Sequence, residues 1–329
     1  MTHLLKISFR TLLQNRFYTF CIVFGFSVSL ILISFSMLMI THDSNTDGFH
    51  LNKKYIYRLL MDHLILDEKV ISSFPGLCEK LKSTFPEIEE ITHIYYPGKV
   101  YIREENSVTY IEDKVIYCDN SFFKVFDFKI VSGNRATCLS DPKSIVVTSN
   151  TAIKYFRSLD VLGKNVYVNN ELLTITGVMD NVLSNSHLQF ESIISFSTLP
   201  KGYSLDYGGP SYLLLNSQAN FKELEGKINK LSSKIANYTE KLINFELQPL
   251  EKAYYYKDSL FSYYSPILRY RSTFFSQAFL FLTIIILILA FVNFVNYSQA
   301  LAIIKINKIK ILKILGITRF QLLAKLLLE

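Results

Sequence analysis

The side chains that most often do chemistry in proteins are sparse in this sequence, and none stands in a pattern typical of catalysis. Ser186 and His187 are adjacent in the segment Asn185-Ser186-His187. Adjacency in sequence does not place a hydroxyl on an imidazole as a nucleophilic triad requires, so we interpret this segment as a capped turn. His42 and His50 are interpreted as scattered surface histidines.

Motifs for phosphate, metal or redox chemistry are also absent from the sequence. Gly163-Lys164 is followed by Asn165, so the twelve glycines form no phosphate-binding loop of the Walker type. No His-Glu-x-x-His, Cys-x-x-Cys or Gly-x-Ser-x-Gly pattern occurs. The sequence therefore predicts no catalytic, cofactor-binding or metal-binding residue. It favours a binding or force-bearing module over an enzyme.

The elements that position the polar residues are dominated by two uncharged stretches. No charged residue occurs in Phe17–Thr41 or in Ser272–Ile304. A helix needs roughly 20 apolar residues to cross a bilayer, so we predict spans at residues 17–41 and 272–302. The first run is longer than a signal-peptide core and no small-x-small site follows Met39, which favours a retained anchor.

The cysteines do not form a disulfide scaffold. Cys21 lies in the first apolar stretch, which leaves the odd set Cys78, Cys118 and Cys138. We expect three free thiols; the alternative is one disulfide bond between two of these cysteines.

Charge is distributed unevenly around the two stretches. Three basic and no acidic residues precede Phe17, and six basic residues face one acidic residue after Ile304. Between the stretches, 26 basic residues face 27 acidic ones. Lys and Arg are retained on the cytoplasmic side, so both ends are predicted cytoplasmic and residues 42–271 are predicted outside. The basic excess thus reports membrane orientation and gives no reason to expect a nucleic-acid partner.

Small and amide side chains predict contacts between helices. Gly25, Ser29 and Ser36 follow one face of the first span, where small residues let another helix approach closely. Asn293 and Asn296 are three residues apart in the second span, and a membrane Asn is costly unless it is hydrogen-bonded. We expect a helix–helix role for all five, with a transport pathway as the alternative for the two Asn residues.

The outside segment predicts an α+β domain, either one large domain or two subdomains. Its expected elements are helices at Leu77–Phe85, Asn150–Phe156 and Phe221–Ile235, strands at Ser144–Thr148 and near Phe245–Leu250, and a hairpin of Val166–Val168 and Leu172–Val178 around Asn169-Asn170. The tyrosine-rich run Tyr254–Tyr270 is interpreted as membrane anchoring. Residues 1–16 are expected to form a cytoplasmic amphipathic helix, or an extension of the first span, and residues 303–329 a second cytoplasmic segment.

Short segments in a fixed order carry a resemblance to a known family. They are Asp47-Gly48-Phe49-His50 with Tyr55-Ile56-Tyr57-Arg58, Asp119-Asn120-Ser121-Phe122-Phe123 with Val125-Phe126 and Ser132-Gly133, Ser144-Ile145-Val146-Val147-Thr148 with Ala152 and Tyr155-Phe156, Leu162-Gly163-Lys164, Thr176-Gly177-Val178, and Ser184-Asn185-Ser186-His187-Leu188. The most specific are residues 290–296, then 310–316 and Arg319. Together they resemble the membrane subunits of MacB/FtsX-type ABC transporters, and particularly the permeases common in Bacteroidetes, over nearly the whole chain.

Some positions depart from the family pattern. Arg157 stands in place of a Gly, Leu183 in place of a common Pro, and Asn307 or Lys308 in place of an acidic residue. The first two are loop positions and leave the expected fold intact, whereas the third bears on the contact with an ATPase. Family members continue with further spans beyond Glu329, so we expect a fragment or a degraded gene product in which two spans alone do not function.

The resemblance implies a MacB-like periplasmic core domain at residues 42–271, followed by the start of an FtsX-like domain. It implies mechanotransmission: a separate cytoplasmic ATPase, which holds ATP and magnesium, moves the spans through a coupling helix near residues 306–316, in export of a drug, peptide or lipoprotein. The residues it assigns to the ATPase contact are Ile309, Leu312, Lys313, Leu315, Gly316 and Arg319. This chain would bind no cofactor itself. Other implied partners are a second permease copy, the lipid of the bacterial inner membrane, and periplasmic or outer-membrane proteins.

A two-span sensor with a truncated output domain is the alternative function. Such a sensor would show heptad repeats after the second span, often broken by proline. Residues 303–325 contain no proline and no sustained heptad register, which disfavours this alternative. A membrane-anchored hydrolase would need an assembled site, which the sequence lacks.

Overall fold

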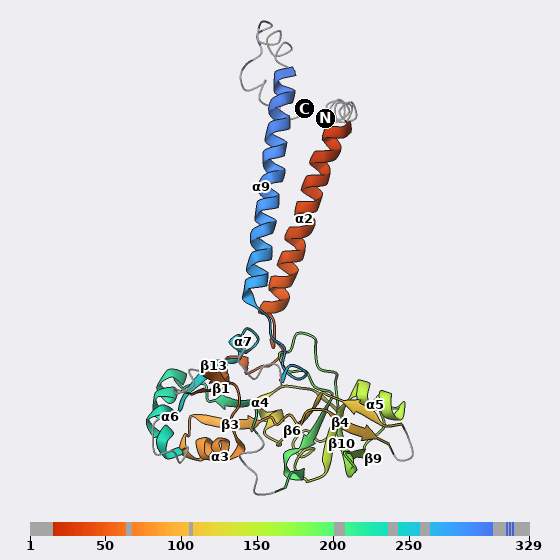
Figure 1. Cartoon of the computed structure of the whole chain (residues 1–329), viewed down its shortest axis with the longest axis vertical. Coiled ribbons are helices and arrows are strands. Elements are labelled where there is room, and N and C mark those ends of the chain that lie inside the picture. The colour runs from red at the N-terminus through yellow and green to blue at the C-terminus, as the bar shows by residue number, and fades with distance from the viewer. Residues whose placement is uncertain are drawn as a thin grey trace. The chain divides into compact units, whose positions relative to one another are not determined.

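Two long helices and a mixed set of strands and helices make up the chain (Figure 1). The computed structural model describes residues 16–63, 68–104, 108–200, 208–235, 243–256 and 264–304, with Ile314, Gly316 and Thr318. Contacts divide the chain into a helical unit, Met1–His42 with Ser272–Glu329, and a mixed unit, Asp43–Arg271.

The helical unit is built on α2 (Arg16–Ser44) and α9 (Thr273–Ile304), which lie side by side in Figure 1. Their stretches Val23–Ser44 and Gln277–Asn296 are long and apolar enough to cross a membrane. Only 11% of the most apolar part of the first stretch and 6% of that of the second are buried, whereas the core helix of a soluble domain is mostly buried. Both expected spans are therefore present as helices.

One sheet of the mixed unit has five antiparallel strands, in the order β13-β1-β12-β3 with β2 beside β1. Its strands are β1 (Ile56–His63), β2 (Glu68–Val70), β3 (Ile88–His93), β12 (Ser211–Leu215) and β13 (Ile243–Pro249). Strand side chains alternate between faces, so Leu59 and Leu213 face a core shared with α3 (Pro75–Thr84) and α6 (Phe221–Ile235). Arg58 and Tyr212 consequently face the other side.

The second sheet has eight strands of mixed direction, in the order β5-β4-β9-β10-β8-β11-β6 with β7 beside β10. Its strands are β4 (Val100–Arg103), β5 (Tyr110–Glu112), β6 (Val115–Cys118), β7 (Ile130–Gly133), β8 (Ser144–Thr148), β9 (Asn165–Val168), β10 (Glu171–Met179) and β11 (Ser192–Ser195). Helix α5 (Ser149–Phe156) contributes to a core on one face, and Thr148 caps its first turn by accepting from the Thr151 N–H. The short elements are α4 (Phe122–Val125), α7 (Leu250–Ala253), η1 (Lys53–Tyr55) and η2 (Phe196–Thr198).

A third core draws residues from both sheets and joins them. It includes Leu60 of β1 and Ile193 of β11, and its densest part is a group of packed aromatic rings. The Phe122 ring stacks on Phe128 with centroids 5.6 Å apart, and Phe126 meets Tyr212 edge-on at 5.1 Å. The two sheets therefore belong to one packed unit.

Most elements expected from the sequence are present, but the tyrosine-rich segment differs. Asn169 and Asn170 adopt the positive φ values of +48° and +70° expected of a hairpin turn. Tyr254 and Tyr264 are buried within the mixed unit, so interpreting them as membrane anchors is wrong. Cys78, Cys118 and Cys138 are buried free thiols, as expected. Residues 1–15 and 305–313, which contain the predicted amphipathic start and most of the predicted coupling helix, lie outside the described residues.

Candidate functional site

The chain enters the mixed unit at Asp43 and leaves it at Arg271, and the structure brings these two points together. Arg271 Nε donates to Asp43 Oδ2 at 3.0 Å, and Asp43 is buried. Two residues earlier, the backbone N–H of Arg269 donates to the carbonyl of His187 at 2.7 Å. The two ends of the unit are therefore fastened to each other and to the loop at residues 183–189.

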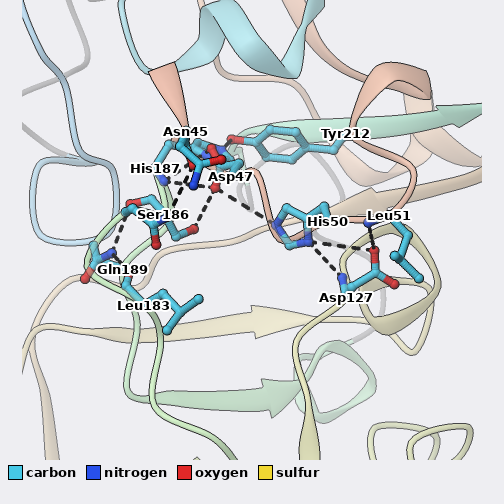
Figure 2. A network of polar contacts seen from close by, with 11 residues as sticks. Asn45, Asp47, His50, Leu51, Asp127, Leu183, Ser186, His187, Gln189 and Tyr212 are labelled. Carbon is cyan, nitrogen blue, oxygen red and sulfur yellow. Dashed lines mark hydrogen bonds and ion pairs between the residues drawn. The ribbon is translucent and has the colours of Figure 1, made fainter. Parts of the chain in front are cut away.

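A buried carboxylate lies at the centre of this region (Figure 2). Asp47 accepts hydrogen bonds from Ser186 Oγ at 2.8 Å, from the backbone N–H of His187 at 3.1 Å and from His187 Nδ1 at 2.6 Å. Its own N–H donates to the carbonyl of Asn185 at 2.8 Å. Its φ of +55° lies in the left-handed region, which Asp and Asn adopt more readily than most residues. One carboxylate thus holds the 183–189 loop against the start of the unit.

His187 links this carboxylate to the five-stranded sheet. Its Nε2 lies 2.8 Å from the hydroxyl of Tyr212 on β12, and both side chains are buried. Nδ1 donates to the Asp47 carboxylate, and Nε2 and the Tyr212 hydroxyl share a second hydrogen bond. Arg58, directly opposite Tyr212 on β1, donates to Gln248 Oε1 at 2.6 Å. A line of buried polar groups therefore runs from the Asp47 carboxylate to the Arg58 guanidinium. We call Asp47, His50, Ser186, His187 and Tyr212 the polar junction.

The charges along this line compensate one another. Burial alone would raise the pKa of the Asp47 carboxyl, but the His187 ring and the hydrogen bonds from His187 and Ser186 lower that pKa below its usual value. Burial raises the pKa of Tyr212, so its hydroxyl keeps the proton. Asp47 is an anion and Arg58 a cation, with a neutral tyrosine between them.

His50 forms a second anchor beside Asp47. Its Nδ1 accepts the backbone N–H of Asp127 at 2.9 Å, and its Nε2 lies 4.0 Å from Asp47 Oδ1. Its ring centroid lies 5.2 Å from that of Phe126 and 5.3 Å from that of Phe128. Burial lowers the pKa of His50 to about 4, so the ring is neutral at physiological pH. His50 therefore connects the start of the unit to its aromatic core without adding a charge.

This arrangement suits holding segments together better than catalysis. Asp47, His187 and Tyr212 lie in the order of a proton relay, but none is more than 2% exposed. None of them lines the pockets at residues 221–252, 148–154 or 99–109. In the same part of the chain, no three or more His, Cys, Asp or Glu side chains are placed to hold a metal ion. Their bonds hold the start of the unit to the 183–189 loop and to β12, so we interpret the junction as a structural contact.

Sequence reasoning missed this junction. His50 is 2% exposed, so its interpretation as a surface histidine is wrong, whereas His42 is exposed. The 183–186 segment does turn, since the Ser186 N–H donates to the Leu183 carbonyl at 3.1 Å. The side chains of Ser186 and His187, however, bind Asp47, and that of Asn185 donates to the Asn45 carbonyl at 3.2 Å. The available signal was that both segments belong to the motifs that carry the family resemblance.

The small residues predicted to pack in the first span lie toward α9. Ser36 Oγ is 3.1 Å from Thr283 Oγ1, and both residues are buried. A Cβ placed on Gly25 would lie 3.9 Å from the Ala290 Cβ. Ser29 is buried and donates to the Gly25 carbonyl at 2.8 Å.

The remaining predicted residues are not brought together. Asn293 and Asn296 are exposed on α9, so their helix–helix role stays a prediction. Gly316 is exposed with a φ of +86°. The other predicted ATPase contacts lie outside the described residues: Ile309, Leu312, Lys313, Leu315 and Arg319.

Comparisons with known proteins find a matching family model and solved structures of similar fold. The model of the MacB-like periplasmic core domain matches residues 27–231. A domain of a protein described as a permease, from Porphyromonas gingivalis, is 18% identical with a TM-score of 0.53, over 61% of this chain and 92% of that one. The periplasmic region of MacB from Actinobacillus actinomycetemcomitans has 13% identity and a TM-score of 0.46, over 61% of this chain and 91% of that one. The extracellular domain of the noncanonic ABC-type transporter YknZ from Gram-positive bacteria has 13% identity and a TM-score of 0.44, over 59% and 99%.

No curated protein matches the sequence. The family match covers more than half of the chain and takes in both segments of the polar junction up to His187 and Tyr212. The expected fold class, two apolar helices flanking a large α+β domain, is confirmed. The chain belongs to the MacB-like periplasmic core domain family.

Proposed function

We propose that this chain is the transmembrane subunit of an ABC transporter and couples ATP hydrolysis by a separate cytoplasmic ATPase to conformational change of the mixed unit. In this proposal the chain lies in a bacterial inner membrane with both ends of the segment in the cytoplasm. It works with a second permease copy in export. ATP and magnesium are held by the ATPase, and this chain binds no cofactor.

The observation that carries the proposal is the way the two ends of the mixed unit are fastened. Asp43 lies in the last turn of α2, and Arg271 lies two residues before the first residue of α9. A displacement of either helix along its axis therefore reaches the Asp43–Arg271 ion pair and the Asp47 carboxylate within a few residues. Flexible tethers at these points would absorb such a displacement instead.

The bonds at the junction are strong enough to transmit it. Breaking a buried, hydrogen-bonded charge away from its partners costs about 3–5 kcal/mol. Since Asp47 holds the 183–189 loop and that loop holds the exit segment at Arg269, the entrance and the exit move as one piece. From Tyr212 the displacement passes into β12, at the centre of the five-stranded sheet.

The ATPase contact is the part of the proposal to test first. The chain is purified in detergent with the ATPase subunit that accompanies it, and Leu312→Asp with Leu315→Asp is introduced into the predicted coupling helix. We expect copurification to be lost, because two carboxylates would have to be buried in an apolar groove.

Lys310→Asp is the matched control, since it adds a carboxylate on the opposite face of the same predicted helix. Protease resistance of the mixed unit reports whether each variant still folds. Copurification of the double variant at the wild-type level would refute the coupling-helix assignment.

A further inference from the structure

One face of the eight-stranded sheet carries side chains unusual for a solvated sheet surface. In β4, Val100 and Ile102 are buried in the core shared with α5, so Tyr101 and Arg103 lie on the opposite face. Tyr101 is 57% exposed, and its cross-strand partner Ile111 on β5 is 63% exposed. The solvated face of an antiparallel sheet is normally polar, so a directly opposed pair of exposed apolar side chains indicates a recognition surface.

A pocket of about 580 Å³ opens at Tyr101, the cross-strand partner of Ile111. It is lined by Lys99, Tyr101, Arg103, Thr109, Asn169 and Asn170. Pockets of roughly 300–1,000 Å³ hold small organic ligands. This lining combines two cations with hydroxyl and amide groups and includes no carboxylate.

The pocket is held in shape by its own strands. The Tyr101 N–H donates to Asn169 Oδ1 at 2.9 Å, and the Asn169 N–H donates to the Tyr101 carbonyl at 2.9 Å. Arg103 lies opposite Tyr167 on β9, with its guanidinium carbon 4.3 Å from the centre of that ring. Stacking fixes the plane of the guanidinium while leaving its N–H groups free to bind.

The two cations of the pocket differ from many others on this unit. Lys143, for example, pairs with Glu171, the residue after Asn170, at 3.8 Å. Within the described part of the chain, no carboxylate forms an ion pair with Lys99 or Arg103. Positive charge next to an exposed aromatic ring is complementary to a ligand that is anionic at one end and apolar at the other.

We propose that this pocket binds a small organic anion, with its acidic group at Lys99 and Arg103 and its apolar body on Tyr101 and Ile111. The site belongs to the mixed unit alone. It goes beyond the proposed transport function and stands whether or not an ATPase binds the chain.

The test uses the full chain in lipid nanodiscs, with calorimetric titration of 1-naphthyl phosphate against an empty-nanodisc blank. Two probes separate the parts of the ligand: inorganic phosphate supplies the anion alone, and 1-naphthyl glucoside supplies the ring without charge. We expect 1-naphthyl phosphate to bind at least tenfold more tightly than either. Equal affinity for inorganic phosphate would overturn the apolar half of the proposal, and equal affinity for the glucoside would overturn the anionic half.

Variants locate the binding. Lys99→Gln with Arg103→Gln is expected to weaken 1-naphthyl phosphate binding by about tenfold, since charge-assisted contacts at an exposed site are each worth a few-fold. Tyr101→Ser is expected to weaken it by a similar factor through loss of the ring. Lys129→Gln, at a lysine that is 77% exposed and pairs with Asp180, is the control and should leave binding unchanged. Binding that is unaffected in the first two variants, while they keep the wild-type thermal melt, would overturn the proposal.

Discussion

Replacing Asp47 by Asn is a sharp perturbation of the polar junction, because it removes one charge and almost no volume. Asn also tolerates the left-handed backbone at this position, so strain is not introduced. The new Oδ1 can still accept from Ser186 Oγ and from the His187 N–H, which both contact Asp47 Oδ1. The bond that is lost joins His187 Nδ1 to Asp47 Oδ2 at 2.6 Å.

The magnitude follows from that single lost bond. A hydrogen bond to a charged group contributes about 1.5–3 kcal/mol, so we expect Asp47→Asn to lower the free energy of opening by about 2–3 kcal/mol. Asp47→Ala leaves all the donors to the carboxylate without an acceptor and adds strain at a left-handed backbone position, so we expect it to lower the free energy of opening by about 4–5 kcal/mol. Ser186→Ala removes one neutral bond and should cost about 1 kcal/mol.

The assay is amide hydrogen exchange of the full chain in nanodiscs, read at residues 183–189 and 267–271. A loss of 2–3 kcal/mol corresponds to roughly 30- to 150-fold faster exchange if these segments open as a local unit. The strands of the eight-stranded sheet serve as an internal reference and should keep their protection. Exchange at the two segments that is within twofold of wild type in Asp47→Asn would refute the assigned role of the carboxylate.

Three further predictions concern other parts of the molecule. His50 has a pKa of about 4 in the folded chain, against an ordinary value of 6.5, so the unfolded chain takes up this proton at a higher pH. Stability therefore falls by about 3 kcal/mol from this group as the pH drops from 6.5 toward 4. In His50→Asn the denaturation midpoint should lose that part of its pH dependence; an unchanged pH dependence, or the same loss in the control His42→Gln, would contradict the assignment. Ser36→Cys with Thr283→Cys should form a disulfide under mild oxidant, because the two hydroxyls lie 3.1 Å apart. The control pair, Met37→Cys with Thr283→Cys, should not form one, because Met37 is exposed on α2. Equal disulfide yields in the two pairs would refute the packing of α2 on α9. Asn229→Ala should lower the free energy of unfolding by about 1–2 kcal/mol and expose the edge of β13, because Asn229 hydrogen-bonds both the N–H and the carbonyl of Phe245. Chemical denaturation measures the first effect and cross-linking between chains the second, with Lys230→Ala as the control. Wild-type stability of Asn229→Ala would count against this role.

The parts of the fold that could be predicted from sequence are those set by local patterns. The two uncharged stretches predicted α2 and α9, because a helix that spans a bilayer needs roughly 20 predominantly apolar residues. Asn169-Asn170 identified its hairpin, because few residues tolerate two successive positive φ values. Helix α3 begins at Pro75, two residues before the predicted start, since proline is well tolerated in the first turn.

The parts that could not be predicted depend on partners distant in sequence. Local sequence predicts His50 at the surface and His187 in a capped turn, and only the fold brings His187 to Asp47, 140 residues away. The same is true of β1, whose neighbours β12 and β13 follow more than 140 residues later. Tyr254 and Tyr264 matched a membrane-anchor composition, but tyrosine fills a core equally well when its hydroxyl finds a partner, as Tyr264 does at the Gly208 carbonyl.

The central claim is that the polar junction passes motion from the spans to the mixed unit. Its most direct test is hydrogen exchange of the chain bound to its ATPase, compared between the nucleotide-free state and the state trapped with ATP and vanadate. We predict that exchange at residues 43–50, 183–189 and 267–271 changes together on trapping, and that Asp47→Asn abolishes this joint change while ATPase binding persists. Identical exchange at all three segments in the two nucleotide states of the wild-type complex would contradict the account.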